Sequence, residues 1–347
     1  MPDLKIYTIL DLRNWLIHNH AAEGLSEKII APARAWAIIH NPYVKDEDAV
    51  VAAIFVNNEV AAYTTAFPEL INGERYWWFS ALWCDPKYRG HGYGIIVIGS
   101  LAEIYGIEHS LDRWGAPDTV EIFTYLGQRT SYSKRYILGS KIDHRTYKGK
   151  LIYLGRYSQK LLHKLIERPA KKVAYELCYI THVDDTTYSF IQQNKKDDYF
   201  LRSKEMLNWI LHYSFTISTP LIEHTRPSSS FSPSETINSQ IYAIQVWDND
   251  TIIGFYMMKL TSKCLHMLYL YYLEEEKSKV FASVRDHIKR MPTSQFLTDN
   301  EELQKYIRQQ IYFPKFRVIN ISFSHPESFA EPTNKTVQYG DGDSFTQ

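Results

Sequence analysis

The chain has 347 residues, which is long for one domain and typical of two domains of about 150 to 200 residues. Its 39 basic and 39 acidic side chains cancel, so no net field attracts nucleic acid or an anionic membrane, and we expect neither as a partner. Hydrophobic residues make up 45% of the chain, which is enough to fill the cores of globular domains.

The cysteines and the N-terminal residues indicate a cytoplasmic protein. Cys84, Cys178 and Cys264 lie far apart and form neither a C-x-x-C metal pair nor a disulfide framework, so we expect a reduced compartment and no metal site. The first residues lack the basic and apolar regions of a signal peptide. No apolar run reaches the roughly 18 residues of a membrane-spanning helix.

Helices and strands alternate along the first half of the chain. Apolar residues at helical spacing predict the helices, and Asn57-Asn58 marks the turn of a hairpin. The predicted elements are helices over residues 10–20 and 26–40, strands over 49–56, 60–67 and 75–84, a helix from the next turn to Gly106, a strand over 119–125, a helix over 130–138 and a strand over 150–154.

The turn after the strand over 75–84 is the most informative segment. It reads, in order, Arg89, Gly90, His91, Gly92, Tyr93 and Gly94. Glycines at alternate positions let the backbone approach a ligand closely, and the first N–H groups of the following helix lack intrahelical partners. A pyrophosphate fits such a helix start. The spacing matches neither the dinucleotide fingerprint nor a Walker loop.

Arg89, Gly92 and Gly94 fill the pattern Arg/Gln-x-x-Gly-x-Gly/Ala, through which the chain resembles the GCN5-related N-acetyltransferases. The resemblance covers most of residues 1–168, although only the turn carries a motif. It implies an α+β fold with a mixed, mostly antiparallel central sheet flanked by helices. It also implies that acetyl-CoA is the co-substrate.

In this family the arm of the cofactor inserts where the strand before the turn parts from the next strand. The resemblance implies that the main chain at Leu82 and Cys84 bonds this arm and the acetyl oxygen. It implies that the main-chain N–H groups from Arg89 to Gly94 hold the pyrophosphate. Cys84 can equally be a plain strand residue, and His91 an exposed loop residue.

The catalytic groups are predicted from the same resemblance. The family's tyrosine, which protonates the leaving thiolate, lies four residues before a Gly-Phe on the helix after the splayed strand. Measured from Gly139 that position holds Arg135, so we predict its neighbour Tyr136, with Tyr132 as an alternative. Glu121 is the predicted general base. Two further carboxylates, Glu69 and Glu74, are alternatives for it.

The second half of the chain repeats the order of elements, which predicts a tandem fold with two related domains. The expected boundaries are 1–168 for the acetyl-CoA-binding domain, 173–325 for a degenerate copy, and 326–347 for a polar tail that is mobile unless it docks. The predicted elements are helices over 200–213, 277–289 and 300–310, and strands over 242–247, 251–260, 265–273, 295–298 and 317–323, with a linker over 164–172 and an insertion over 226–234.

The second copy lacks the glycine turn. Glu274, Glu275 and Glu276 stand in its place, and three carboxylates repel a pyrophosphate. An unrelated α+β domain is the alternative for this half.

The sequence therefore predicts an N-acetyltransferase that transfers an acetyl group from acetyl-CoA to an amine of a small molecule or peptide, by direct attack in a ternary complex. A non-catalytic CoA-binding or regulatory module and an aminoacyl-tRNA-dependent transferase remain alternatives. The acceptor and the oligomeric state are not predicted.

Overall fold

The computed structural model describes most of the chain. The described residues are 1–18, 22–113, 117–139, 174–195, 198–213, 240–261, 264–291, 293–311, 313, 315–329 and 337–341. The predicted strand over 150–154, the linker over 164–172 and the insertion over 226–234 lie outside these ranges.

The first half begins with a strand and two helices and continues with a three-stranded meander. Strand β2 is buried except at its last residue because its sequence, AVVAAIFV, is a continuous apolar run suited to a sheet covered on both faces. The elements of this half are β1 (Asp3–Thr8), α1 (Ile9–His18), α2 (Pro32–Ile39), β2 (Ala49–Val56), β3 (Glu59–Ile71), β4 (Glu74–Cys84), α3 (Tyr93–Tyr105), β5 (Ser110–Arg113), α4 (Pro117–Tyr125) and β6 (Arg129–Gly139).

The second half has the same order of elements. Ser203 caps α7 and Asn300 caps α9, each accepting a hydrogen bond from a first-turn N–H. The elements are β7 (Glu176–Ile180), α6 (Asp185–Gln193), α7 (Lys204–His212), β8 (Gln240–Asp248), β9 (Thr251–Leu260), β10 (Cys264–Tyr272), α8 (Lys277–Arg290), β11 (Gln295–Thr298), α9 (Glu301–Gln310) and β12 (Lys315–His325).

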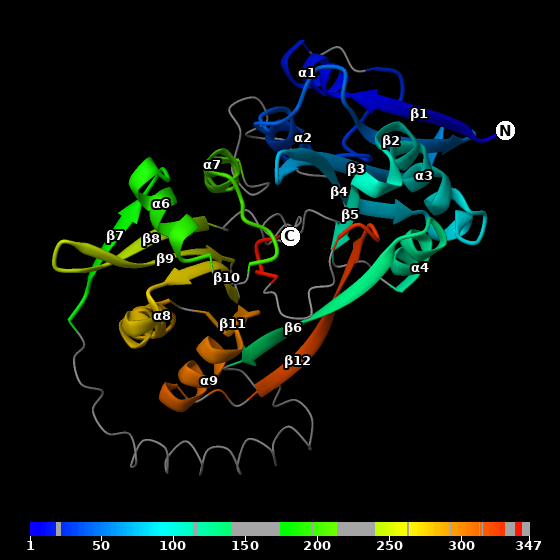
Figure 1. Cartoon of the computed structure of the whole chain (residues 1–347). Coiled ribbons are helices and arrows are strands. Elements are labelled where there is room, and N and C mark those ends of the chain that lie inside the picture. The colour runs from blue at the N-terminus through cyan, green and yellow to red at the C-terminus, as the bar shows by residue number, and fades with distance from the viewer. Residues whose placement is uncertain are drawn as a thin grey trace.

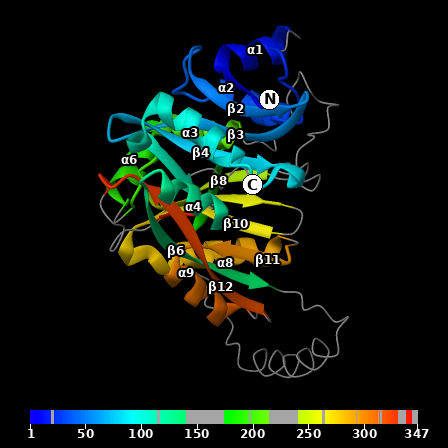
Figure 2. The same cartoon turned by 90° about the vertical axis from the view of Figure 1, so that its right-hand side faces the viewer.

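The described strands form one twelve-stranded sheet in the order β1-β2-β3-β4-β5-β12-β6-β11-β10-β9-β8-β7. Each half gives a strand to the other, because β12 lies between β5 and β6, and β6 lies between β12 and β11. The long β6 and β12 cross from one half to the other side by side (Figures 1 and 2), paired antiparallel from Arg129–His325 to Gly139–Lys315. The halves are therefore joined by backbone hydrogen bonds.

The predicted fold class is confirmed: the chain is a mixed α+β protein with two similar halves. Strands over 49–56, 251–260 and 295–298 begin and end where they were predicted. The predicted helix over 26–40 is shorter, as α2 begins at Pro32. The domain boundaries stay a prediction. Part of the predicted tail, residues 337–341, is buried against the rest of the chain.

Two predicted elements are wrong. Residues 119–125 lie in helix α4 and not in a strand, and residues 130–138 lie in strand β6 and not in a helix. The β-branched and aromatic residues of the first segment favour a strand, but Pro117 and Asp118 begin a helix and Gly127 follows it. The second segment becomes a strand because β11 and β12 pair with both of its edges.

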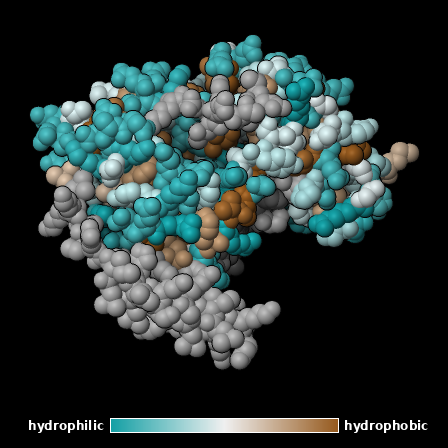
Figure 3. Space-filling model, turned by 60° about the horizontal axis from the view of Figure 1, so that its bottom comes forward, coloured by the Kyte–Doolittle hydropathy of each residue, from teal (hydrophilic) through white to brown (hydrophobic). Residues whose placement is uncertain are grey.

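The face of the molecule in Figure 3 is mainly hydrophilic, and its brown apolar areas are interrupted by polar ones. None of the helices in the described ranges is long and apolar enough to span a bilayer.

Candidate functional site

The site begins with a β-bulge in β4. The register between β3 and β4 shifts by one residue between Tyr63–Trp83 and Thr65–Ser80, so β4 has one residue more than its partner here. Ala81 carries the strain, with a φ of 56°, which is rare for a residue with a Cβ. A bulge bends its strand and redirects the backbone groups beside it. It lies where the resemblance places the acetyl group.

Directly before the bulge, β4 stops pairing with β5. These parallel strands are paired only at Trp77–Ser110, Trp78–Leu111 and Phe79–Asp112. The rest of β4, from Ser80 to Cys84, does not pair with the described residues of β5 and is largely half-buried. We call this point of divergence the first fork. Among the described residues no strand pairs with this edge of β4 from Ser80 to Cys84, and such an edge suits an extended ligand.

The glycine turn follows at the end of β4. Gly90 and Gly92 have φ values of 81° and 77°, a region that favours glycine. A Cβ added at either residue would meet no atom within 4 Å, so the space above the turn is open. Gly92 is the N-cap of α3 and provides no side-chain cap. The first N–H groups of α3 are thus available to an anion.

Arg89 and His91 are exposed at this turn. Arg89 has no ion pair with the described residues, and its charge partly offsets the burial that raises the pKa of the Cys84 thiol. Because that pKa is raised, Cys84 is a poor nucleophile. His91 turns Nδ1 toward the carbonyl oxygens of Tyr88 and Arg89, at 3.1 and 3.2 Å, so its ring stabilises the turn itself.

Helix α4 also contacts the turn, which the sequence did not predict. A Cβ added at Gly94 would lie 3.4 Å from Cδ1 of Ile122 and 3.9 Å from Cδ1 of Leu82. Ile122 and Leu82 therefore flank the start of α3 on the side of the first fork. Pro117 and Gly127, at the two ends of α4, were the signals that could have identified this helix.

The corrected helix changes the catalytic assignment. In the family pattern, the tyrosine lies four residues before a Gly-Phe on this helix, and here Gly127 follows the helix but is itself followed by Gln128 rather than Phe. Counted from Gly127, that position holds the fully buried Phe123, which has no proton to donate. Glu121 lies on α4 and not on a splayed strand, and its side chain is exposed.

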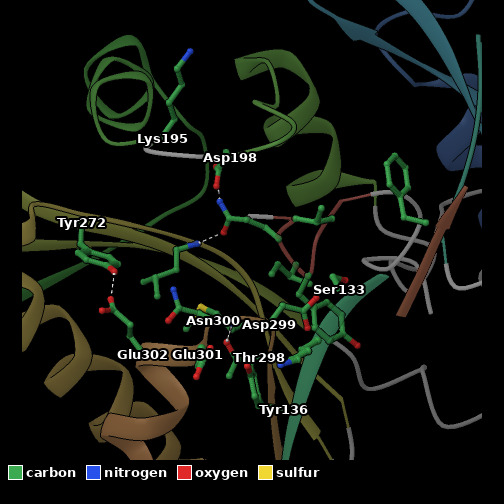
Figure 4. Close-up of a pocket in the computed structure, with 18 of the residues that line it drawn as sticks. Ser133, Tyr136, Lys195, Asp198, Tyr272, Thr298, Asp299, Asn300, Glu301 and Glu302 are labelled. Atoms are coloured by element: carbon green, nitrogen blue, oxygen red, sulfur yellow. Dashed lines mark hydrogen bonds between the residues drawn. The ribbon is translucent and has the colours of Figure 1, made fainter. Parts of the chain in front are cut away.

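Tyr136, on β6, lines a pocket whose other walls come mainly from the second half. This pocket has a volume of about 600 Å³ and is lined by β6, β10, the start of α9 and residues 337–339, and no described residue of β4 or the glycine turn lines it. Tyr136, Asp299 and Glu301 lie close together on one side of it (Figure 4). Burial, with Glu301 nearby, raises the pKa of Tyr136.

Both alternative carboxylates are engaged elsewhere. Glu69 is buried and accepts hydrogen bonds from Trp78 and from Arg202 of the second half. Glu74 accepts a hydrogen bond from Tyr76 at the opposite end of β4 from the turn. The structure thus brings Leu82, Cys84 and the turn together, and leaves Tyr136 apart from them.

The first and second halves share this plan of a bulged central strand and a three-pair parallel contact with its neighbour. A candidate acetyltransferase from Pyrococcus horikoshii superposes on 98% of the chain, over 93% of its own length, with a TM-score of 0.51 and 10% identity. The chain has the GCN5-related N-acetyltransferase fold.

Two further structures with this fold align at lower scores. In a GCN5-related N-acetyltransferase from Anabaena variabilis, 72% of the residues align with 93% of the chain, at a TM-score of 0.49 and 11% identity. A tandem protein from the clavulanic acid biosynthesis pathway aligns over its full length with 97% of the chain, at a TM-score of 0.47 and 11% identity. No protein-family profile and no curated protein sequence matches the chain.

No group of three or more potential metal ligands occurs within the described ranges.

Proposed function

We propose that the chain is an acyl-CoA-dependent acyltransferase whose first fork and glycine turn bind acetyl-CoA. The observation that carries the proposal is the adjacency of two features: a helix start without a side-chain cap, at Gly92, and a β4 edge beyond Phe79 with which no described residue of β5 pairs. The first suits a pyrophosphate and the second suits an extended arm. One strand connects them, so a single ligand can occupy both.

In this proposal the chain acts mainly through its backbone. The N–H groups from Arg89 to Gly94 bind the pyrophosphate, with the Arg89 guanidinium beside them. The main chain at Leu82 and Cys84 binds the arm and polarises the acetyl carbonyl. A fixed N–H group aimed at a developing oxyanion lowers the activation free energy by about 3 kcal/mol. The acceptor is an amine of a small molecule or peptide, attacking directly.

A second candidate is a module that binds CoA without turnover. Phe123 favours it, because the position of the family's tyrosine holds no hydroxyl. The two candidates differ in one measurement, the release of free thiol from acetyl-CoA across a panel of amines. Turnover with any amine supports the enzyme, and tight binding without thiol release supports the module.

The binding site is tested by isothermal titration of acetyl-CoA. Gly92→Trp fills the space above the turn, and Arg89→Glu reverses its charge, so each should weaken binding by about 100-fold. The matched control is Gly73→Trp, since Gly73 also has a positive φ, of 88°, and open space, but lies in the hairpin at the other end of β4. Unchanged affinity in Gly92→Trp would refute the assigned site.

A further inference from the structure

The second half contains a fork of its own. Strands β10 and β11 are paired in parallel only at Cys264–Gln295, Leu265–Phe296 and His266–Leu297. The register of β10 against β9 then shifts by one residue between Met267 and Tyr269, as that of β4 does against β3. We call the divergence beyond His266 and Leu297 the second fork. Its central strand has the same bulged form as β4.

Residues 337–341, from the C-terminal part of the chain, occupy this second fork. The N–H of Gly340 donates to the carbonyl oxygen of Leu268 at 2.8 Å, and the N–H of Leu270 donates to Oε1 of Gln338 at 2.8 Å. A Cβ on Gly340 would lie 2.3 Å from the Tyr269 ring, so this close approach requires glycine. The segment thus lies along the β10 edge that matches the open edge of β4.

Side-chain contacts of Tyr339 and Asp341 also hold the segment in place. The ring of Tyr339 lies 3.6 Å from the guanidinium of Arg135, and its hydroxyl is 2.5 Å from Nδ1 of His266. Asp341 accepts a hydrogen bond from the N–H of Gln338 at 2.7 Å, which closes the segment into a turn. In Figure 1 this short red segment lies in the middle of the molecule, beside β10.

The same segment binds β5, at the first fork. Arg113 directly follows Asp112, the last β5 residue paired with β4. Its guanidinium donates to the carbonyl oxygens of Gln338 and Asp341, the latter at 3.1 Å, and to Asp299 at 2.9 Å. Arg113 is buried, and its planar fork of donors fixes direction as well as distance. The place where β5 leaves β4 is therefore tied to the C-terminal segment.

We propose that residues 337–341 form a latch that fills the second fork in place of a cofactor arm and, through Arg113, sets the opening of the first fork. Arg113 is then a positioning residue, and the affinity of the first fork for acyl-CoA depends on whether the latch is docked. The inference rests on the proposed function, because it concerns binding at the first fork.

The test uses the full chain and a matched pair of substitutions. Gly340→Ala places a methyl group against Tyr269, whereas Gly99→Ala, in the middle of α3, meets nothing within 4 Å. Hydrogen–deuterium exchange of the Leu270 amide reports docking of the latch, and titration of acetyl-CoA reports the first fork. We expect Gly340→Ala to speed exchange and weaken affinity, each by about tenfold, and Gly99→Ala to change neither.

Two further variants guard against a misfolded Gly340→Ala chain. Gln338→Ala removes the acceptor of the Leu270 amide and should change both readouts in the same direction. Arg113→Lys keeps the charge but not the forked contacts, and should weaken acetyl-CoA binding about tenfold. Faster exchange with unchanged affinity would overturn the coupling, and unchanged exchange would overturn the docked latch.

The result separates this inference from the proposed function. If the unmodified chain binds no acetyl-CoA, the proposed function and the coupling both fail. The exchange of the Leu270 amide would still decide whether the latch occupies the second fork.

Discussion

Single residues decide the chemistry of both forks. At the first fork, Gly90 and Gly92 adopt positive φ values and leave open space, and Ala81 accepts a strained φ in the bulge. At the second, Gly340 permits a contact that no other residue allows. These positions differ in what a side chain would meet, so their substitution should affect different properties.

The role of Tyr136 is a residue-scale question. Its hydroxyl interacts with Glu301, and the pocket that they line includes no described residue of β4 or the glycine turn that would bring a thioester to it. We therefore expect Tyr136→Phe to change kcat for acetyl transfer by less than about threefold. A loss of about 100-fold, with a flattened basic limb of the pH profile, would instead support the acid predicted from the sequence.

The latch also carries a titrating group. Burial raises the pKa of Asp341 to about 7, although Arg202 and Arg113 face it, and Glu69 adds to the rise. A carboxyl whose pKa is higher in the folded state than in the unfolded state contributes its full stability at pH values below the unfolded-state pKa. This contribution is lost as the pH rises to the folded-state pKa.

We therefore expect stability to fall between about pH 4 and pH 7 more steeply in the unmodified chain than in Asp341→Asn, by at least about 1 kcal/mol across the window. Urea unfolding at several pH values measures the difference. Parallel slopes in the two proteins would show that Asp341 does not hold its proton in the folded state.

At the scale of elements, the packing of α8 on β9 depends on the absence of one side chain. A Cβ on Gly254 would lie 2.5 Å from Cγ2 of Val280, so strand and helix meet at contact distance. We expect Gly254→Ala to lower the free energy of unfolding by about 1 to 3 kcal/mol because of overpacking.

The double variant Gly254→Ala with Val280→Ala relieves this contact. Its destabilisation should be smaller than the sum of the two single effects, as measured by a double-mutant cycle. Additive effects would mean that the two positions do not meet.

Helix α4, which follows β5 in the chain, shows why local sequence was insufficient. Its central residues favour a strand, and only one of its side chains, that of Phe123, is buried. Its end signals were correct, with Pro117 at the start and Gly127 after the end. The strand-favouring composition of this segment therefore predicts the wrong element, and the predictions for Glu121 and Tyr136 place both residues on the wrong kind of element.

For the whole molecule, the exchange of β6 and β12 makes each half depend on the other. Strand β12 pairs with β5 at Phe323–Arg113, and β11 pairs with β6 along its whole length. The ion pair between Glu69 and Arg202, at 2.5 Å and buried, adds a second link between halves. Removing one partner of such a pair leaves a buried charge, which is costly.

We therefore expect the fragment 1–168 to lack a cooperative unfolding transition on its own. Near-ultraviolet circular dichroism and urea unfolding measure this, and adding the fragment 169–347 should restore native signal. A fragment 1–168 that unfolds cooperatively alone would show that its sheet does not need β12.

The sequence by itself determined the features that depend on neighbours along the chain. The glycine turn, the start of α3 and strands such as β2 follow from local composition, spacing and turn residues, and all three lie where they were predicted. The acidic residues Glu274–Glu276 likewise predict that the second half has no phosphate site, and they form the turn that leads into α8.

Only the tertiary structure decided what depends on distant partners. Strand β6 is a strand because β11 and β12 pair with it, and residues 337–341 are ordered because Arg113 and β10 bind them. Backbone N–H and C=O groups must find partners when buried, and the nearest partner can be some 200 residues away, as for Arg113 and Asp341, 228 residues apart. Sequence spacing contains no record of such pairings.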